Sequence, residues 1–404
     1  MKRAFFSISL LASLALVAGG PVIREGSVTV SQDRSRKVTI TYALDDAPAI
    51  VTVDVLTNGV SIGAANYTNM VGAVNVIVQP GENRTVTWRP DKSWPLHFTK
   101  ATVNVKAWPL DAPPDYLVVY DLTRAGCVRY YADADGVPFG VTNEIYKTEQ
   151  LVMRRIHANG RTYREGAPVS SYVDGVRKVS FTNDYYIGIY FLTQGQVMKI
   201  GALSSNPSTF KGDSYPDWRK YPVETLAASV LRGKYEWPVG GHANVTESST
   251  IGKLSKRTGL TFDIPTNSEW EYAMRAGSSE RWFWGSSSDY SVCTNYIWMS
   301  ANNGSKVKPH EVGLLLPNPW GIYDCYGLLY QHTLDRQVSG DKLPSGYYVN
   351  PVGQDASYST RCTTRGGRDD FGVLSCDSNY RAGVNATEGY CNNGFRLMCL
   401  CPGQ

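Results

Sequence analysis

The sequence pattern changes at a proline-rich stretch, and this change most constrains how the chain can fold. The stretch reads Pro-Leu-Asp-Ala-Pro-Pro-Asp over residues 109–115. Proline fixes its own backbone angle φ and cannot donate a hydrogen bond to a sheet, so we predict a linker over residues 109–116. Apolar and polar residues alternate before the stretch, whereas aromatic residues and glycines become frequent after it. The 404-residue chain is therefore predicted to contain two folded units.

Residues 27–108 have the period-two pattern of β-strands. The runs 38–44 and 51–55 each place an apolar residue at every second position, and Asn58-Gly59 offers a tight hairpin turn. Short alternating runs separated by frequent turns are typical of a β-sandwich. We predict a small immunoglobulin- or fibronectin-like sandwich over residues 27–108, acting either as a spacer or as a binding platform.

The N-terminus has the pattern of a secretory signal peptide. Lys2-Arg3 precede an apolar run over residues 4–18, and Gly19-Gly20 come after it. The run is too short to span a bilayer, and no cysteine that could carry a lipid stands after the predicted cleavage point. We expect residues 1–20 to be a signal peptide. The protein is then expected to be secreted or held in the cell envelope, without membrane insertion.

Charge and cysteine content exclude several classes of partner and ligand. The formal net charge of +4 is small for this length, and no block of like charges stands out, so nucleic acid is not an expected partner. The eight cysteines are an even number, which allows disulfides in an exported protein but leaves their pairing open. Because C-x-x-C spacing is absent and the five histidines are scattered, we predict no metal site.

Two helices are predicted in the second unit. The first spans residues 222–233, with proline at its start and glycine at its end. The second spans residues 266–277 and begins with the capping box Thr266-x-x-Glu269. Much of the remaining sequence must form loops.

Several short motifs succeed one another in this unit. Residues 262–273 read F-D-I-P-T-N-S-E-W-E-Y-A, and residues 317–324 read P-N-P-W-G-I-Y-D. Others are N-D-Y-Y-I-G-I-Y-F-L-T at 183–193, Y-P-V at 221–223, W-F-W-G at 282–285, R-G-G-R at 365–368, Y-R at 380–381 and a terminal G-F-R-L strand at 394–397. In this order they resemble motifs of the formylglycine-generating enzyme (sulfatase-modifying factor) family.

The resemblance implies a fold class. It predicts an α+β, loop-rich, C-type-lectin-like domain over residues 117–404, with the family core at about 150–400, preceded by the all-β sandwich. The motif aromatics are expected to be fold determinants packed in the core. Family membership by itself leaves the chemistry open, because function lies in the site and not in the fold.

The enzymes of the family are oxidases that hold Cu(I) between two cysteine thiolates. Soft thiolates suit Cu(I), and in the family the two cysteines lie five positions apart after the glycine pair. In this chain Phe371 stands at the first cysteine position and Cys376 at the second. Phenylalanine cannot bind copper, so Cys376 is expected to be catalytic, and copper to be a cofactor, only if the protein is nevertheless an oxidase. Cys391 could supply a second thiolate in space.

The family's calcium ligands are also altered. The resemblance implies calcium-binding oxygens in a G-N-V-W-E-W segment, which here reads G-L-L-Y-Q-H at residues 327–332. Leucine offers no side-chain oxygen, and glutamine lacks the charge that a hard cation prefers. We therefore expect no calcium and no other cofactor. Because the histidines are scattered, the iron site of a related branch is not expected either.

The C-terminal segment instead suggests recognition. Some members of the family are variable proteins of diversity-generating retroelements, whose AAC codons can change into codons for many residues but not for Lys, Met, Gln, Glu or Trp. Residues 368–393 contain none of these except Glu388. Loops on a rigid scaffold tolerate such change, and Tyr with short polar side chains makes adaptable contacts.

This hypothesis predicts a non-catalytic protein that binds a protein or glycan ligand through a surface of the C-terminal loop segment. The expected ligand-binding residues are Arg368, Asp369, Asp370, Phe371, Val373, Leu374, Ser375, Asp377, Asn379, Asn385, Tyr390, Asn392 and Asn393. The alternative is a formylglycine-generating oxidase that converts the active-site cysteine of a sulfatase. A structural envelope protein without a specific ligand is a third possibility.

Overall fold

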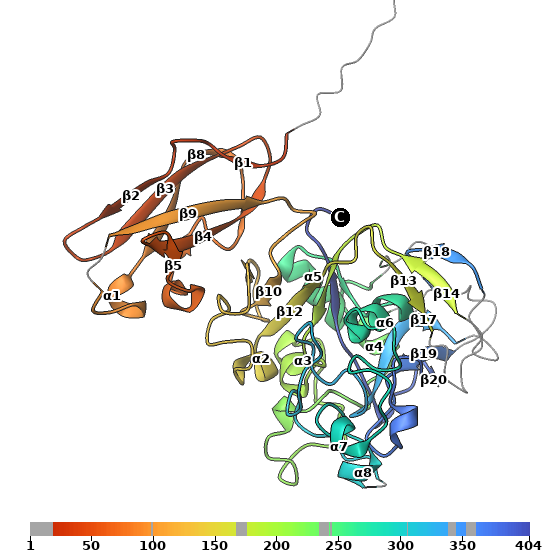
Figure 1. Ribbon diagram of the computed structural model, residues 1–404. Helices are drawn as coiled ribbons and strands as arrows, with labels where there is room; N and C mark the ends of the chain where they lie inside the picture. The colour runs from red at the N-terminus through yellow and green to blue at the C-terminus, as the bar shows by residue number, and fades with distance from the viewer. Residues whose placement is uncertain are drawn as a thin grey trace, which may run out of the picture.

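The computed structural model describes residues 19–97, 100–166, 176–233, 242, 245–304, 306–337, 345–352 and 361–404. The apolar run of the predicted signal peptide, residues 4–18, lies outside the described residues. Figure 1 shows two units, an elongated β-sandwich and a larger C-terminal domain of short strands, short helices and loops. Within the described residues, no helix is long and apolar enough to cross a membrane.

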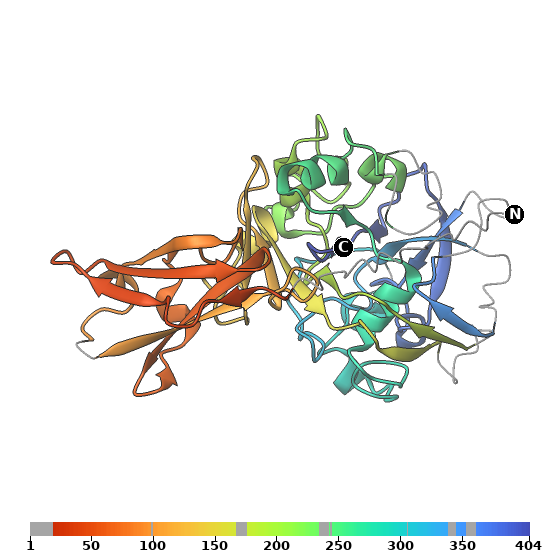
Figure 2. The same cartoon turned by 90° about the horizontal axis from the view of Figure 1, so that it is seen from above.

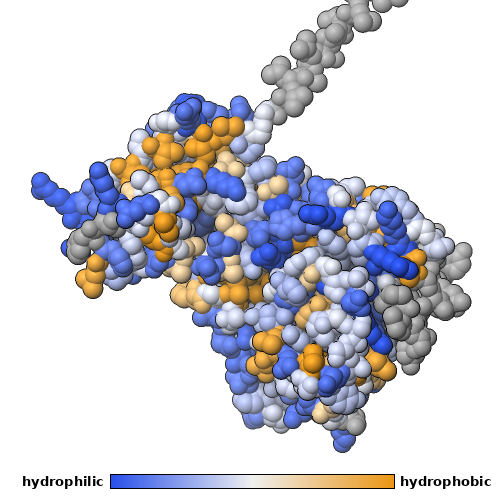
Figure 3. All heavy atoms as spheres, viewed as in Figure 1, coloured by the Kyte–Doolittle hydropathy of each residue, from blue (hydrophilic) through white to orange (hydrophobic). Residues whose placement is uncertain are grey.

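The sandwich consists of two antiparallel sheets. One sheet contains β1 (Val22–Ile23), β2 (Thr29–Gln32), β3 (Val38–Asp45), β6 (Val71–Gly72) and β8 (Gly81–Trp88). The other contains β4 (Ala49–Thr57), β5 (Val60–Ser61), β7 (Ile77–Val78) and β9 (Ala101–Trp108). Figure 3 shows that hydrophobic atoms gather on the visible face of this unit.

The alternating sequence pattern produces the core of the sandwich. Ile40, Leu44, Val51 and Val55 are fully buried between the sheets. The predicted hairpin joins β4 to β5, with Asn58 and Gly59 at φ angles of 52° and 77°. These positive angles are those of the turn that matches strand twist, and asparagine and glycine are the residues that adopt them most readily.

A six-stranded sheet forms one core of the C-terminal domain. Its strands lie in the order β11 (Val128–Tyr131), β10 (Tyr116–Val119), β12 (Leu151–Ile156), β15 (Tyr185–Gly188), β22 (Met398–Leu400) and β16 (Phe262–Asp263). The last strand of the chain thus lies between two earlier ones. The G-F-R-L motif itself runs through the connection from β21 to β22 and is not a continuous strand, which corrects the sequence prediction.

Two smaller sheets complete the domain. One has the order β20 (Arg381–Asn385), β19 (Arg361–Arg365), β17 (Tyr330–Arg336) and β21 (Asn393–Gly394). The other has the order β13 (Thr162–Glu165), β14 (Arg177–Ser180) and β18 (Tyr347–Val349). Helices of the domain include α4 (Ala228–Arg232), α6 (Asn267–Arg275), α7 (Tyr290–Cys293) and α8 (Ser300–Asn303). The predicted α+β, loop-rich fold class is confirmed.

The two predicted helices have different outcomes. Helix α6 begins after its capping box as predicted, because Thr266 Oγ1 accepts from Glu269 N at 3.2 Å and the Glu269 carboxylate accepts from Thr266 N at 2.7 Å. The predicted start of the other helix at Pro222 is wrong, since α4 begins only at Ala228. Pro222 instead forms a β-bridge, so a tertiary contact holds this segment extended.

The sandwich is docked against the C-terminal domain. Ile50 of β4 is fully buried in the main core of that domain, with Trp108 packed against the same cluster. The main-chain amide of Tyr130 donates to the carbonyl of Asn75 at 2.9 Å. Figure 2 shows the sandwich projecting from the side of the domain at which β10, β11 and β12 lie. These contacts create a packed junction between the two units.

Candidate functional site

The C-terminal segment is anchored on the four-stranded sheet. Strand β19 pairs antiparallel with both β17 and β20, which places Arg365 opposite Gln331 on one side and Arg381 on the other. Residues 366–380 form the connection from β19 to β20 and contain most of the predicted ligand-binding residues. The sheet therefore fixes both ends of this loop.

The R-G-G corner requires its two glycines. Gly366 and Gly367 have φ angles of 83° and 73°, in the left-handed region that other residues rarely adopt. A Cβ atom on Gly367 would lie 2.2 Å from the carbonyl oxygen of Ser375 and 2.9 Å from Cys376 Sγ. The tight corner therefore brings the start of the loop directly against its middle.

A buried carboxylate binds the separate motifs together. Glu271, from the W-E-Y-A motif on α6, accepts hydrogen bonds from Gly166 N at 2.8 Å, from Arg275 Nε at 2.9 Å and from Arg365, and Arg381 lies 3.5 Å away. Desolvation raises the pKa of Glu271, but the attraction of the three arginines outweighs it and lowers the pKa to about 2. The ionised carboxylate therefore connects α6 to two other motifs: to the R-G-G corner through Arg365 and to the Y-R strand through Arg381.

A second buried acid extends this network. Glu165 of β13 is fully buried and accepts from Arg177 Nε at 2.6 Å, from Ser268 Oγ at 2.8 Å and from Arg381 at 3.2 Å. Arg381 therefore lies between two carboxylates that come from different elements. Breaking one of these ion pairs would leave a buried charge without a partner, and the desolvation free energy of that charge would destabilise the fold.

Gln331 is a hydrogen-bond centre for the G-F-R-L motif. Its Oε1 accepts from Trp270 Nε1 at 3.0 Å and from Arg396 Nε at 2.8 Å. Its Nε2 donates to the carbonyl oxygens of Asp324 and Cys325 at 3.2 and 3.1 Å. A glutamate could not donate to those carbonyls. Gln331, which the family resemblance places at a calcium-ligand position, thus has a structural use, while the expectation of no calcium stays a prediction.

The middle of the loop is held by the W-F-W-G region. Arg281 donates to Asp377 Oδ2 at 2.7 Å and to the carbonyl oxygen of Leu374 at 2.6 Å. Trp282 Nε1 donates to the carbonyl oxygen of Cys376 at 2.6 Å. These contacts fix the backbone on the inner side of the loop and leave the side chain of Leu374 exposed on the outer side.

The predicted ligand-binding residues differ in exposure. Leu374 is exposed, and seven others are half-buried: Arg368, Asp370, Phe371, Ser375, Asn385, Tyr390 and Asn392. Five are buried: Asp369, Val373, Asp377, Asn379 and Asn393. The exposed and half-buried members therefore provide most of the accessible surface, with a small contribution from Val373, which is 5% exposed.

The accessible surface borders a shallow hollow of about 580 Å³. It is lined on one side by Ser288, Asp289 and Tyr290 at the start of α7 and on the other by residues 372–375. Tyr290 and Leu374 are about half exposed, at 54% and 51%. The hollow lies at the end of the domain that carries α7 and α8 (Figure 1), where small separate apolar patches lie among polar atoms (Figure 3). We call this surface the α7–η4 hollow, after α7 and the short 3₁₀ helix η4 (Val373–Ser375).

An arginine and three aromatic rings form a cluster in the same loop region. The Arg368 guanidinium lies 4.3 Å from the ring centre of Phe371 and 5.7 Å from that of Tyr330. The rings of Tyr330 and Phe371 are 5.9 Å apart, and the Tyr330 and Tyr380 hydroxyls are joined at 3.2 Å. Asp370 pairs with Arg368 at 2.6 Å. Aromatic, arginine and acidic groups together suit binding to a mixed polar and apolar partner.

Asp369 supports the loop from within. Its Oδ2 accepts from Asn303 Nδ2 and from the main-chain amide of Lys308, both at 2.8 Å. Burial raises the pKa of Asp369 to about 7, although the amide of Lys308 favours the ionised form. The side chain thus ties the loop to the last residue of α8 and to the backbone at Lys308.

Cys376 has the surroundings of a structural thiol. It is fully buried, its Sγ donates to the carbonyl oxygen of Arg368 at 3.3 Å, and burial raises its pKa far above the usual range for cysteine. Metal binding and nucleophilic attack both require the thiolate. Phe371, at the position of the other copper ligand in the oxidases, packs with Tyr330 and Tyr380. Cys391 is exposed, whereas the other seven cysteines are buried free thiols.

Sequence reasoning missed the α7 side of the hollow. Ser288, Asp289 and Tyr290 lie outside every recognised motif, and their contact with residues 372–375 depends on long-range packing. Arg281 was missed as well, although it stands directly before the W-F-W-G motif. The one available signal was the pair of aromatic residues, Tyr290 and Tyr296, in a polar stretch.

Comparison with known proteins places the domain in a family. The model of the sulfatase-modifying factor enzyme 1-like domain matches residues 176–399, more than half of the chain. The protein belongs to this family, whose fold organises the buried arginine motifs described above. The curated chaperone protein LppX of Paenibacillus barcinonensis is 27% identical over 184 residues, which are 39% of this chain. The chain spans about 63% of the length of that relative.

Two solved structures are similar to this chain. Variable protein 1 of Treponema denticola matches with a TM-score of 0.51 and 21% identity, over 62% of this chain and 95% of that chain. PvdO from Pseudomonas aeruginosa matches with a TM-score of 0.49 and 18% identity, over 62% and 94%. At 21% identity, the similarity to variable protein 1 shows the fold alone.

Replacing the central carboxylate should destabilise the domain. Glu271→Gln leaves Arg365 and Arg381 buried with one carboxylate fewer, and we expect a loss of about 3–5 kcal/mol in the free energy of unfolding of the C-terminal domain. Because the folded-state pKa of Glu271 is lowered from 4.5 to about 2, its contribution is present above pH 4.5 and is lost as the pH falls toward 2. Urea denaturation monitored by tryptophan fluorescence measures both effects.

Glu149→Gln is the matched control. Glu149 forms an exposed pair with Lys199 at 3.6 Å, and such pairs contribute little to stability. Equal denaturation midpoints for the two variants would contradict the central role of Glu271.

Proposed function

We propose that the protein is an exported recognition protein that binds a protein or glycan ligand through the α7–η4 hollow and the adjoining Arg368 cluster. It belongs to a family that includes oxidases, but its C-terminal domain acts as a binding scaffold. The sandwich holds this domain away from the point of attachment or secretion. No bound metal is required for this function.

The observation that carries the proposal is that two sets of residues are separate. One set, which we call the frame, consists of Arg365, Arg381, Arg396 and the groups that bind them, and the other is the exposed rim of the hollow. Arg365, Arg381 and Arg396 are held in ion pairs or dense hydrogen bonds inside the domain, whereas Tyr290 and Leu374 project at the rim of the hollow. Side chains on such a rim can change without disturbing the core. The hollow is wide and shallow, which suits the surface of a macromolecule better than a small molecule enclosed on all sides.

The surroundings of Cys376 support binding over oxidation. A copper pair needs two adjacent thiolates, but Phe371 stands at one position and the remaining thiol is buried and protonated. The proposal therefore assigns Cys376 a packing role. It also narrows the expected ligand contacts to the exposed and half-buried side chains of the segment.

Ligand selection on the hollow tests the proposal. Residues 21–404 are panned against a phage-displayed peptide library and applied to a glycan array, and selected ligands are then measured by biolayer interferometry. We expect Leu374→Asp to weaken binding at least tenfold, about 1.4 kcal/mol, because it places a charge at the apolar rim. Leu314→Asp is the control, since Leu314 is equally exposed, at 52%, but lies outside the hollow. Ligands that bind both variants alike would place the binding surface elsewhere.

A peptide assay tests the alternative activity. The folded protein is incubated with Cu(I), oxygen, a reductant and a Cys-x-Pro-x-Arg peptide, and the peptide mass is read by mass spectrometry beside an active oxidase of the family. We expect no conversion of the cysteine to formylglycine. Conversion that disappears in Cys376→Ser would establish an oxidase and overturn the proposal.

Comparison of sister genomes tests the diversification hypothesis. We expect differences to concentrate at codons of accessible residues such as Asp370, Phe371, Leu374 and Ser375, and to spare Gly366 and the other frame residues. Even variation along the whole gene would contradict retroelement-driven change without affecting the binding proposal itself.

A further inference from the structure

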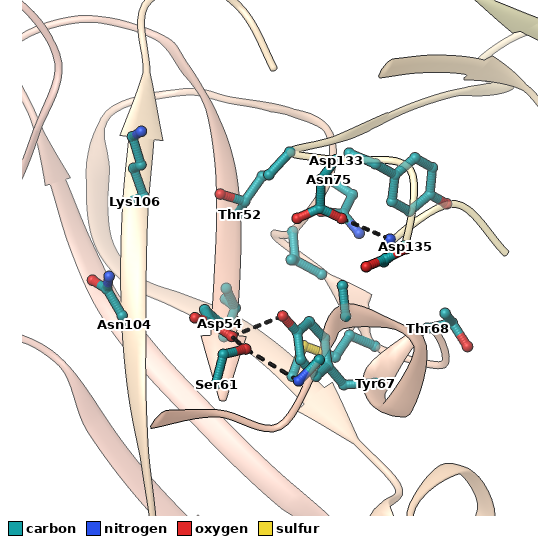
Figure 4. A pocket seen from close by; sticks show the side chains of 18 of the residues that line it. Thr52, Asp54, Ser61, Tyr67, Thr68, Asn75, Asn104, Lys106, Asp133 and Asp135 are labelled. Carbon is teal, nitrogen blue, oxygen red and sulfur yellow. Dashed lines mark hydrogen bonds between the residues drawn. The ribbon is translucent and has the colours of Figure 1, made fainter. Parts of the chain in front are cut away.

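A cavity of about 420 Å³ lies where the sandwich meets the C-terminal domain. Strands β4 and β9 and the segment from β5 to the 3₁₀ helix η1 (Ala64–Tyr67) line one side, and residues 131–136 at and after the end of β11 line the other (Figure 4). It shares no residue with the α7–η4 hollow. Small-molecule sites commonly have this volume and occur preferentially where two domains meet.

The charged side chains of the cavity are mostly acidic. Asp54 comes from the sandwich, while Asp133 and Asp135 come from the C-terminal domain. The only basic residue among the lining residues is Lys106, so three carboxylates and one ammonium give a net charge of −2. The Lys106 ammonium already lies 3.4 Å from the ring centre of Trp108. The cavity therefore favours a positively charged ligand.

Neighbouring groups orient two of the carboxylates. Asp54 Oδ1 accepts from Ser61 Oγ at 2.6 Å and from the Tyr67 hydroxyl at 2.9 Å. Asp133 Oδ1 accepts from Gly136 N at 2.9 Å. In the part of the chain that the structure describes, no hydrogen bond engages the second oxygen of either residue or the carboxylate of Asp135. Figure 4 shows Asp54 on one side of the cavity and Asp133 and Asp135 on the other.

The remaining lining suits an organic cation better than a metal ion. Tyr67, Met70, Val74 and Tyr131 add aromatic and aliphatic side chains to the lining. Aromatic faces attract organic cations, and apolar surface accommodates their methylene groups. Among the described residues, no three His, Cys, Asp or Glu side chains lie close enough to hold a metal ion.

We propose that this cavity binds a small organic cation, an amine or guanidinium compound, between the sandwich and the C-terminal domain. The ligand pairs with Asp54 on one side and with Asp133 and Asp135 on the other. It thereby offsets the repulsion between carboxylates of the two units and strengthens their junction. The proposal is independent of ligand binding at the α7–η4 hollow.

Calorimetric titration of residues 21–404 with agmatine, which carries one amine and one guanidinium group, tests this site. We expect saturable binding at one site that weakens as sodium chloride is raised, because the attraction is electrostatic. Asp135→Asn should weaken binding roughly fivefold, and the double variant with Asp54→Asn more than roughly tenfold. Asp135 is the first choice because its removal breaks no internal hydrogen bond among the described residues.

A control variant and a neutral probe test whether agmatine binding depends on the carboxylates of the cavity. Asp213→Asn removes an exposed carboxylate outside the cavity and should bind agmatine as the unaltered protein does. Glucose serves as a neutral polar probe of similar size. Absence of agmatine binding, equal affinity in the Asp135 variant, or binding of glucose in preference to agmatine would each overturn the proposal.

Discussion

The C-terminal domain depends on one buried carboxylate. Glu271 is fully buried and lies among Arg275, Arg365 and Arg381, which come from α6, β19 and β20. Glu165 pairs with Arg177 and Arg381 beside it. Each arginine would be costly to bury alone, so the ion pairs hold together the strands and the helix that supply them. The loop from residue 366 to 380 takes its position from this arrangement, as does the hollow at its outer edge.

The same frame separates the residues that support the fold from those at the rim of the hollow. The frame uses main-chain turns, buried arginines and the Gln331 centre, and these lie apart from the rim formed by Tyr290 and Leu374. Phe371, at the position where the family resemblance implies a copper-binding cysteine, lies outside this frame and packs with Tyr330. Side chains at the rim can therefore differ in residue type while the buried arginines and Gln331 still hold the loop in place.

Sequence analysis predicted much of the fold because strong local signals were present. The capping box at Thr266 and the asparagine–glycine turn at Asn58 depend on neighbours within a few residues, and both formed as predicted. The start of a helix at Pro222 failed because a bridge to a distant segment holds that residue extended. Five of the predicted ligand-binding residues are buried, since composition carries no information on which side chains of a loop turn inward.

The sequence by itself determined the alternating sandwich, the ordered family motifs and the phenylalanine at position 371, because these are properties of residue type and local spacing. Only the tertiary structure decided which motif contacts which, since Glu271 and Arg365 are 94 residues apart. It also decided where the surfaces lie. The α7–η4 hollow and the interdomain cavity each join segments distant in sequence, and such contacts arise from packing of the whole chain.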